Sequence, residues 1–535
     1  MPQKGLSAAA LGLILIFALL VQVPSLGFLL PDFALEDEMI IVQGFHQVVN
    51  SDFESYAALK YPGLIFLLLG LFFFPSYVIC NYQTLVHLKS LADLKIFLSH
   101  PYLPDPAAVY LGRVMSMIAG IASVWLFFAV FRRRLGDGAA LLSSLFLISS
   151  YAWLFSSSVL KIDSALLLSF MLLLYASYGI LDRGDAKDYA LAGVGLGLCL
   201  ASKYHFFALA PLIAGHWLKH SSSGWRKIFL SPSFWLSILL GLAVFFVLSP
   251  FPFLHPLKAL DALRLEFAIQ SRELPLLRAQ SRVWFQSPIL FQLTSAFPYA
   301  MGMLGYLIAI LGMTRAGKYF DRKSLILFVS YPAAFFAGWA MISRLGFPHL
   351  YLTIIPFFAV FAGIFIDQLF GKKIHFKVLG FLLILASVTF NLFSFQELNR
   401  AQSWILDASL GWVENKNPGR EKTVAFFPYR PLAGSRYDLC FNFLPQFMLT
   451  EDGLKKSHPE QILVHQTYYL AYLNHPLLQS PAKQGFIYLA SERSSYRLER
   501  EWKARLSWAK IYGYLFPDLK NLSVVLYSST SSPGP

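Results

Sequence analysis

Residues 107–134 read AAVYLGRVMSMIAGIASVWLFFAVFRRR, an apolar run that ends in three arginines. A helix needs about 20 apolar residues to cross the hydrocarbon core of a bilayer, and this run is long enough. Basic residues directly after an apolar run are typical of the cytoplasmic end of a membrane span. The stretch therefore predicts a spanning helix over residues 107–131 with residues 132–134 in the cytoplasm.

The composition of the whole chain agrees with this reading. Of its 535 residues, 56% are hydrophobic, 16% aromatic and only 14% charged, and the mean hydropathy is +0.55. Soluble domains contain about 25% charged residues. The formal net charge of +14 does not indicate nucleic-acid binding, because the basic residues form short clusters between apolar runs. The cysteines, Cys80, Cys199 and Cys440, form no CxxC motif and predict no disulfide framework.

The apolar runs predict about 11 membrane spans. The candidate runs are residues 7–30, 62–79, 107–131, 138–158, 164–182, 189–218, 233–252, 298–313, 324–342, 349–367 and 376–394. The basic clusters between them, which the positive-inside rule assigns to the cytoplasm, are residues 132–134, 183–187, 225–227, 315–323 and 371–377. The first run is longer than the apolar region of a signal peptide. We therefore predict a retained first span, a cytoplasmic N-terminus and an extracytoplasmic C-terminus in the plasma (inner) membrane.

Two runs do not fit one simple crossing each. An odd number of crossings must separate the outer loop after the first span from the basic cluster at 132–134. Residues 62–79, bracketed by Pro62 and Pro75, are therefore predicted to form a re-entrant or interfacial helix. The run 189–218 lies between two cytoplasmic clusters and must cross an even number of times. Its glycines and the Ser202–Lys203 pair predict two short helices that meet near Lys203.

These patterns predict a polytopic α-helical membrane domain over residues 1–394, with outer loops at 31–106 and 253–297. From residue 395 charges become frequent and apolar runs shorten. Segments 423–427, 486–490 and 523–527 have the composition of strands, and residues 398–415 that of a helix. We predict a soluble extracytoplasmic α/β domain over residues 395–535.

Two groups of carboxylates are the candidates for chemistry. Residues 35–45, LEDEMIIVQGF, place Glu36, Asp37 and Glu38 a few residues after the first span. Asp163 lies where one apolar run ends and the next begins. Carboxylates at the edge of a membrane are costly and are functional candidates by default, although an aspartate before an apolar run is also a good helix N-cap. The predicted topology places Asp37 and Asp163 on the same face.

Cationic residues on that face are candidates for an anionic partner. The planar guanidinium of arginine matches phosphate oxygens. The alternatives are an amphipathic helix on anionic headgroups and, at the helix junction, side chains whose charged ends extend to the membrane surface. The candidate phosphate-binding residues are Arg264, Arg272, Arg278 and Arg282 in the loop 253–297, and Arg344 and His349 at another outer junction.

The order of these motifs resembles a known family. An acid pair early in the first outer loop is followed by Tyr-Pro before an apolar run, and then by AVYLGRVMSMIAG, RRRLGDGAALLSSLFLISS, VLKIDSALLLSF and LAGVGLGLCLASKY. This series is similar to integral-membrane GT-C glycosyltransferases of the protein-O-mannosyltransferase and aminoarabinose-transferase-like group. The resemblance covers residues 8–395, and the segment after it resembles the tail of many bacterial members.

The resemblance implies an inverting transfer of a sugar from a polyprenyl-phosphate-linked donor on the extracytoplasmic face. It implies that Asp37 is the catalytic aspartate, with Glu38 the neighbouring acid and Asp163 the acid at the second outer junction. We also take Lys60, Tyr61 and Lys203 as candidates for substrate binding. One departure concerns the phosphate: the family often has Arg-Tyr where this chain has His349-Leu350, which leaves Arg344 or a loop arginine as substitutes.

The chemistry is consistent with the residues themselves. Asp37 could take the proton of an attacking hydroxyl while Glu38 or Asp163 orients the acceptor, and arginine can stabilise the leaving phosphate. A divalent cation is therefore not required, although Asp37, Glu38 and Asp163 could hold one. The alternatives are a transporter or flippase for a lipid-linked sugar, a polymerase or ligase that uses a diphosphate-linked glycan, and a non-enzymatic scaffold. The sequence leaves the sugar and the acceptor (protein, lipid or glycan) open.

Overall fold

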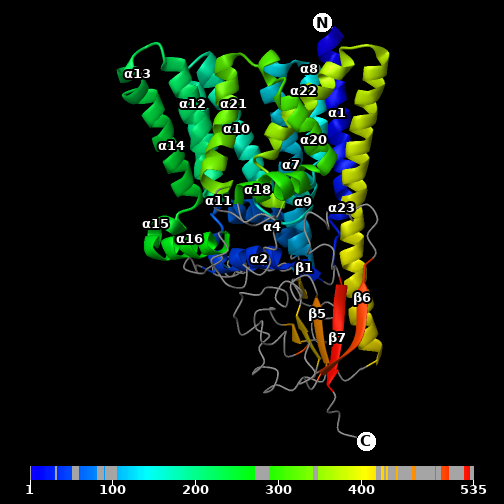
Figure 1. Ribbon diagram of the computed structural model, residues 1–535. Coiled ribbons are helices and arrows are strands. Elements are labelled where there is room, and N and C mark those ends of the chain that lie inside the picture. Colours follow the sequence, from blue (N-terminus) through cyan, green and yellow to red (C-terminus); the bar gives the residue numbers. More distant parts are fainter. Residues whose placement is uncertain are drawn as a thin grey trace, which may run out of the picture.

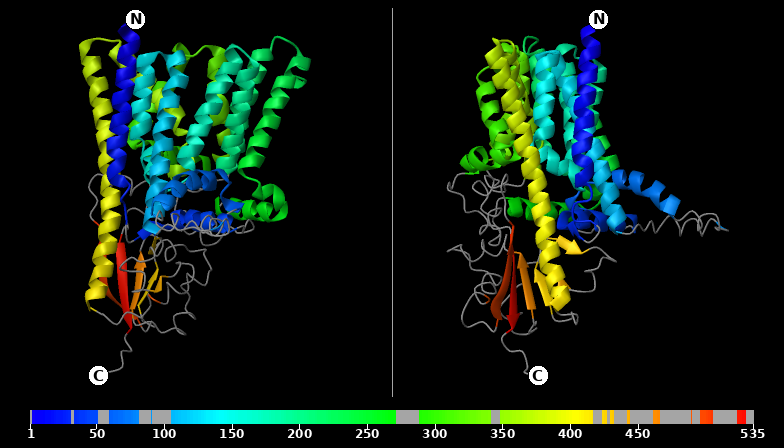
Figure 2. Two further views of the ribbon diagram at one scale, coloured as in Figure 1. Left: turned by 180° about the vertical axis from the view of Figure 1, so that it is seen from behind. Right: turned by 90° about the vertical axis from the view of Figure 1, so that its right-hand side faces the viewer.

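A computed structural model describes residues 2–30, 33–50, 59–80, 90, 105–270, 288–340, 348–416, 423–426, 429–431, 442–443, 461–465, 489, 496–504 and 523–529. They form a helical bundle, a group of helices lying across one end of it, and a β-sheet beyond those helices (Figures 1 and 2). We call the end of the bundle that faces the sheet the site end. The N-terminus lies at the opposite end (Figure 1).

The bundle is built from the apolar runs of the sequence. Its helices are α1 (Pro2–Gln22), α7 (Asp105–Leu135), α8 (Asp137–Ser149), α9 (Tyr151–Ser158), α10 (Asp163–Asp182), α11 (Ala186–Lys203), α12 (Leu209–His220), α14 (Pro232–Leu248), α18 (Pro288–Phe291), α19 (Phe297–Met301), α20 (Met303–Met313), α21 (Arg322–Phe335), α22 (Ile355–Phe370) and α23 (Ile374–Lys416). Large apolar side chains on the outside of α14, such as Leu239 and Val247, are exposed, as expected of a surface that faces lipid.

By length and composition, five helices among the described residues can cross a membrane, or up to seven if each of two bent pairs is one span. The chain is therefore an integral membrane protein, while the number of about 11 spans remains a prediction. The bent pairs are α8 with α9, at 60°, and Pro288–Met301 with Met303–Met313, at 114°. Gly302 makes the second bend possible, because its φ of 87° is strained for any residue with a Cβ.

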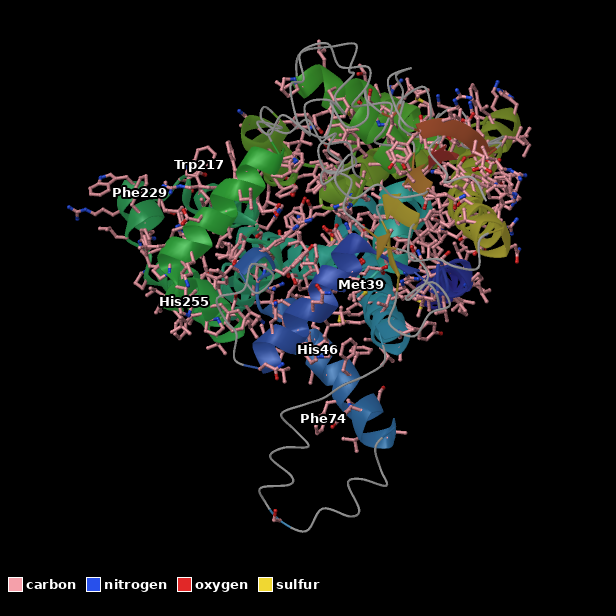
Figure 3. The ribbon with its side chains drawn as sticks, turned by 90° about the horizontal axis from the view of Figure 1, so that it is seen from below. Met39, His46, Phe74, Trp217, Phe229 and His255 are labelled. Carbon is pink, nitrogen blue, oxygen red and sulfur yellow. The ribbon has the colours of Figure 1, made fainter. Side chains whose placement is uncertain are left out.

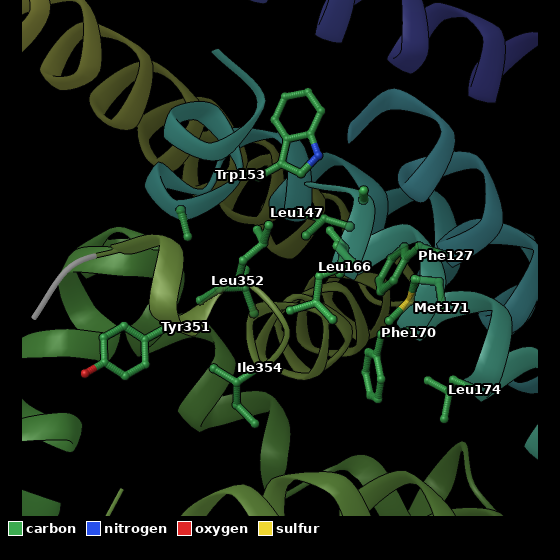
Figure 4. Close-up of a cluster of buried hydrophobic side chains, with 14 of the residues drawn as sticks. Phe127, Leu147, Trp153, Leu166, Phe170, Met171, Leu174, Tyr351, Leu352 and Ile354 are labelled. Atoms are coloured by element: carbon green, nitrogen blue, oxygen red, sulfur yellow. The ribbon is translucent and has the colours of Figure 1, made fainter. Parts of the chain in front are cut away.

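The core of the bundle combines apolar packing with a few internal hydrogen bonds. Trp153 of α9 is fully buried, and its indole N–H donates to the backbone oxygen of Gly120 at 3.2 Å. Figure 4 shows side chains of α7, α9 and α10 gathered with those of the segment just before α22. This core fixes the α9–α10 junction, which carries part of the candidate site.

Neither unusual run forms a single long helix. Residues 62–79 form the apolar helix α4 (Leu64–Cys80), and its apolar part, Leu64–Ile79, is shorter than a span. The run 189–218 divides into α11 and α12, separated by the short helix η2 (Phe206–Ala208). The chain turns at Tyr204, which has a φ of 49° directly after Lys203. Together with α2 (Glu36–Val49), α15 (Phe251–Leu254) and α16 (Pro256–Gln270), α4 lies across the site end (Figure 1).

The basic turns meet at the opposite end. Arg134 contacts Asp182 at 2.5 Å and donates to Ser324 Oγ at 3.2 Å. Lys219 Nζ donates to the backbone oxygen of Asp182 at 2.9 Å. The short helix α13 (Trp225–Phe229) and the N-terminus lie at this end too (Figure 1). Charged turns and candidate acids are therefore separated by the length of the bundle.

A mixed five-stranded sheet lies beyond the site end, with strand order β4-β2-β5-β7-β6. Its strands are β2 (Thr423–Phe426), β4 (Asn442–Phe443), β5 (Gln461–His465), β6 (Tyr496–Lys503) and β7 (Ser523–Ser529). β2 pairs in parallel with β4 and β5, and β7 pairs antiparallel with β5 and β6. The strands expected at 423–427 and 523–527 are present. For 486–490, only Leu489 belongs to the described residues, where it is helical.

The domain boundary predicted at residue 395 falls inside a helix, because α23 runs without interruption from Ile374 to Lys416. Its last turns pack on the sheet through Ile405, Leu410 and Val413, which share a buried cluster with residues of β5 and β7. The run predicted as the last span and the helix predicted over residues 398–415 are thus one continuous helix.

A second connection joins the sheet region to the membrane part. Strand β1 (Phe33–Leu35) pairs antiparallel with β3 (Tyr429–Pro431), so that Leu35 lies opposite Tyr429. β1 ends one residue before α2 begins. The start of the acid-bearing helix is therefore attached to the C-terminal part of the chain.

Candidate active site

The first turn of α2 carries the acid triplet. Leu35, the residue before the helix, has an extended backbone with a ψ of 146°, and its N–H donates to Glu38 Oε2 at 3.0 Å. A glutamate at the third helical position commonly caps the helix start in this way. Acidic side chains in the first turn also interact favourably with the helix dipole. Local chemistry therefore sets the position at which α2 begins and the direction of Glu38.

Glu38 forms a fully buried ion pair with Arg113 of α7. Arg113 Nε donates to Oε1 at 2.8 Å and Nη2 to Oε2 at 2.7 Å, and both side chains are 0% exposed. Arg113 Nη1 also donates to the backbone oxygens of Leu26 and Phe28. The backbone N–H of Leu160 donates to Glu38 Oε1 at 2.8 Å. One pair thus joins the end of the first span, α2, α7 and the α9–α10 junction.

The environment of Glu38 bears on the role expected for it. We predicted that Glu38 or Asp163 orients the acceptor, but both oxygens of Glu38 are occupied by Arg113 and by two backbone N–H groups. The Glu38 side chain is 0% exposed, and its bonds hold the first turn of α2, which also carries Asp37.

Asp37 has a different environment. Its Oδ2 accepts from Lys161 Nζ at 2.7 Å, and Tyr61 donates to its Oδ1 at 3.4 Å. The Asp37 side chain is 39% exposed, whereas that of Lys161 is 8% exposed. Burial alone would raise the pKa of the Asp37 carboxyl, but the charges of Lys161 and Lys60 outweigh it and hold that pKa well below its usual range. Asp37 is therefore an accessible carboxylate at neutral pH.

Lys161 is held at the junction between α9 and α10. Its backbone N–H donates to Ser116 Oγ at 3.3 Å, and the Ser116 hydroxyl donates back to the backbone oxygen of Lys161 at 3.0 Å. At the other end of the side chain, Nζ also lies 3.2 Å from Nε2 of His349. A cationic ammonium can only donate, so the imidazole nitrogen accepts. The lysine therefore links Asp37 to His349 of η6 (Pro348–Tyr351).

Asp163 forms the second half of the site. It begins α10, its side chain is 5% exposed, and its Oδ1 accepts from Lys203 Nζ at 2.7 Å. Lys203 ends α11, and the next residue, Tyr204, donates to the backbone oxygen of Leu59 at 2.8 Å. The break between α11 and α12 thus brings Lys203 to Asp163 and ties this junction to the segment before Lys60.

The other predicted residues divide into three groups. Lys60 and Tyr61 lie beside Asp37, and Lys60 Nζ also pairs with Glu266 of α16 at 3.2 Å. Arg264 is exposed and pairs with Asp261 on its own helix at 3.3 Å, so the structure does not bring it into the carboxylate cluster. Arg272, Arg278, Arg282 and Arg344 lie outside the described residues.

Sequence reasoning missed two cations, Arg113 and Lys161. Both carried a signal, since an ionisable residue inside an apolar run is a functional candidate by default. Arg113 interrupts the run 107–131, and Lys161 stands two residues before Asp163. Their partners could not be read from the sequence, because Glu38 lies 75 residues from Arg113 and Asp37 lies 124 residues from Lys161.

The cluster has the character of an ion-pair site. Each of the carboxylates expected to share a metal has its own cation: Lys161 for Asp37, Arg113 for Glu38 and Lys203 for Asp163. In the part of the chain that the structure describes, no group of three His, Cys, Asp or Glu residues could hold a metal ion. Asp37 and Asp163 thus each lie beside the ammonium group of a lysine.

Comparison with protein families gives one match. Residues 110–250, about a quarter of the chain, match the family described as dolichyl-phosphate-mannose-protein mannosyltransferase. The segment contains Arg113, Lys161, Asp163 and Lys203. The match agrees, over these residues, with the expected resemblance to the protein-O-mannosyltransferase group. A comparison with curated proteins gives no match.

Solved structures show similar architectures at low identity. ArnT from Cupriavidus metallidurans bound to undecaprenyl phosphate has 13% identity and a TM-score of 0.47, with 98% of each chain covered. AglB from Archaeoglobus fulgidus, in complex with an inhibitory peptide and a dolichol-phosphate, has 12% identity and a TM-score of 0.46, covering 98% of this chain and 89% of that one. The S. cerevisiae Pmt1-Pmt2 complex bound to the sugar donor has 17% identity and a TM-score of 0.33, covering 52% and 37%. At such scores, the function must be argued from this chain's own residues.

Proposed function

We propose that the protein is an inverting glycosyltransferase, which moves a sugar from a polyprenyl-phosphate-linked donor to an acceptor hydroxyl. The observation that carries the proposal is the accessible Asp37 carboxylate beside the ammonium of Lys161, 2.7 Å away. Transfer from a lipid phosphate needs both kinds of group, a base for the hydroxyl proton and a cation for the leaving phosphate. The family match of residues 110–250 supports the same class of reaction.

An apolar groove next to these charges supports a lipid-linked donor. It has a volume of about 580 Å³ and lies between α2, α4, α14 and α15, with Phe45, Val49, Phe66, Leu71, Val247 and Phe251 among its lining residues. Figure 3 shows α2 crossing the site end, with Met39 and His46 along it and Phe74 of α4 beyond them. Phe45 lies eight positions after Asp37 on α2, which corresponds to a rise of about 12 Å along the helix. An isoprenoid chain in the groove would place its phosphate toward the charged cluster.

The reaction follows from these groups. The acceptor oxygen forms a bond to the anomeric carbon as the bond from that carbon to the phosphate oxygen breaks. The hydroxyl proton passes to Asp37, and the lipid monophosphate leaves with both electrons of the broken bond. A single displacement of this kind inverts the anomeric configuration. The proposed reaction uses lysine cations and requires no metal or other cofactor.

The site end is assigned to the extracytoplasmic face in this proposal. The basic turns around Arg134 and Lys219 lie at the opposite end of the bundle, and such clusters favour the cytoplasmic side. Donors whose sugar has already been carried across the membrane would then reach Asp37 from the outer leaflet. The sheet beyond the site end lies on the same side, with β1 attaching it to the start of α2.

The test is sugar transfer in membranes that contain the protein, from a panel of polyprenyl-phosphate-linked radiolabelled sugars. We expect the wild type to consume one donor and to move its label out of the lipid fraction. Asp37→Asn should reduce this rate by about 100-fold or more, because general-base catalysis contributes roughly 10²–10⁴-fold. Asp261→Asn is the matched control, since Asp261 is exposed on α16.

Two results would count against the proposal. The reaction class fails if the wild type transfers none of the sugars in a panel that spans neutral, amino and acidic hexoses and pentoses. The assignment of the base fails if Asp37→Asn transfers the sugar as fast as the wild type. Thermal unfolding of the purified variant, followed by tryptophan fluorescence, separates loss of the base from loss of the fold.

A further inference from the structure

The ammonium of Lys161 lies between two side chains of the candidate site. Its ammonium contacts Asp37 at 2.7 Å and His349 at 3.2 Å, while its backbone is fixed by Ser116. The Asp37 carboxylate, by contrast, is open to solvent on one side. A lysine side chain has three rotatable donors on a flexible stem. The ammonium can therefore turn toward a second anion without any movement of the helices.

We propose that Lys161 exchanges partners during the reaction, holding Asp37 in the empty site and the donor phosphate once the donor is bound. This inference rests on the proposed function and adds a residue and a step to it. Lys161 then has two roles: it stabilises the leaving phosphate, and by moving away it releases the base when a donor is present.

The charges of the reaction favour this exchange. Before transfer, the donor phosphodiester carries one negative charge and so does Asp37. After transfer, the proton has passed to Asp37, which becomes neutral, and the lipid monophosphate has gained a second negative charge. A cation between the two groups is therefore attracted more strongly to the phosphate as the reaction proceeds. An interaction that strengthens in this way lowers the barrier rather than merely tightening binding.

The exchange also resolves a conflict in the empty site. A general base works best when its pKa lies near the working pH, whereas the charges of Lys161 and Lys60 hold the pKa of Asp37 well below its usual range. Removal of one ammonium from the carboxylate makes Asp37 a stronger base. The groups that face Asp37 are Lys161 from the α9–α10 junction, Lys60 and Tyr61 from the segment before α4, and His349 from η6, with the Asp163–Lys203 pair behind them.

The first experiment measures binding without turnover. Purified protein in lipid nanodiscs is titrated with polyprenyl phosphate and, as a control ligand, with the uncharged polyprenol. We expect Lys161→Met to weaken polyprenyl phosphate binding by about 10–100-fold, the effect of losing one charge-assisted hydrogen bond, and to leave polyprenol binding unchanged. Lys161→Arg should retain most of the affinity. Lys219→Met, at the opposite end of the bundle, is the matched control.

The Asp37→Asn variant tests directly whether Asp37 and the phosphate compete for Lys161. If Asp37 and the phosphate compete for one ammonium, removal of the carboxylate charge should tighten polyprenyl phosphate binding. Lys161→Met added to Asp37→Asn should abolish this gain. Lys161→Met that binds polyprenyl phosphate within twofold of the wild type, or a gain in Asp37→Asn that persists without Lys161, would overturn the proposal.

The second experiment is the pH profile of kcat/KM, which reports the ionisation of the free enzyme. The wild type should keep its activity to below the usual range of a carboxyl, because Lys161 and Lys60 lower the pKa of Asp37. Lys161→Met removes a positive charge, so the pKa rises and the acid limb should move to higher pH. A variant with a lower rate but an unmoved acid limb would mean a structural lysine only. Loss of transfer in the wild type would instead contradict the proposed function.

Discussion

Two neighbouring carboxylates on the same helical turn belong to two different regions of this molecule. The region around Glu38 is closed, because its ion pair with Arg113 is inaccessible to solvent and every oxygen is engaged. The region around Asp37 is open on one side, because the Asp37 side chain is partly exposed. Of the two carboxylates, a substrate can therefore reach only that of Asp37. Acids that are adjacent in the sequence, such as Asp37 and Glu38, can therefore have different roles.

The closed region makes the open region possible. Desolvating a charged pair costs much of what its attraction gains, so a buried pair is weak support for stability in itself. What the Glu38–Arg113 pair provides is position, since it joins four segments of the chain at the start of α2. Asp37 can therefore remain half-exposed and still point at Lys161.

The largest expected effect comes from breaking the closed pair. Arg113→Met leaves the buried charge of Glu38 without its cation, which should lower the free energy of unfolding by about 3–5 kcal/mol. Asp37→Asn should lower it by only about 1 kcal/mol, because the amide oxygen of asparagine can still accept from the Lys161 ammonium. Chemical unfolding in detergent, followed by tryptophan fluorescence, measures both.

A double variant sharpens this prediction. Glu38→Gln combined with Arg113→Met removes both charges and should recover part of the loss, because the amide oxygen can still accept from a backbone N–H. A non-additive result of this sign would show direct coupling between the two residues. Equal stability of Arg113→Met and Asp37→Asn would contradict the distinction between the two regions.

An intermediate effect is expected at Asp163, which is buried but whose partner Lys203 is partly exposed. Asp163→Asn should lower the free energy of unfolding by about 1.5–3 kcal/mol, the range of a single hydrogen bond to a charged group. Sugar transfer should fall further, by about tenfold or more, if the Asp163–Lys203 pair shapes the site next to Asp37. Unfolding and transfer are measured on the same preparation, and a loss of stability with full activity would remove Asp163 from the site.

Much of the helical part could be predicted from the sequence because the signals are local. The position of α4 follows from an apolar run too short to span, and the break after Lys203 from polar residues and glycines inside an apolar run. The span predicted over residues 376–394 and the helix predicted over residues 398–415 are one helix, α23, although the composition changes at residue 395. No glycine or proline stands between Gly380 and Gly411, so nothing in the chain stops the helix there.

The ion pairs could not be predicted in the same way. Asp37, Glu38 and Asp163 were found as carboxylates at a membrane edge, but their partners come from segments that only tertiary packing brings together. We distinguish Asp37 from Glu38 by the exposure of their side chains. That exposure depends on tertiary neighbours such as Leu160, which cover Glu38 but leave Asp37 open. A sequence pattern identifies which residues are costly to bury, whereas the structure shows which of them are compensated.

The smallest expected effect concerns the pair at the rim of the open region. Lys60 and Glu266 are 3.2 Å apart, and both side chains are partly exposed, so the pair should contribute no more than about 1 kcal/mol. Glu266→Gln should therefore shift the thermal midpoint by less than about 4 °C. Because it leaves more of the Lys60 charge for anions nearby, the variant should bind polyprenyl phosphate slightly more tightly than the wild type. A loss of stability as large as that of Arg113→Met would mean that the exposed Lys60–Glu266 pair contributes as much as the buried Glu38–Arg113 pair. Exposure of an ion pair would then not predict its contribution to stability in this protein.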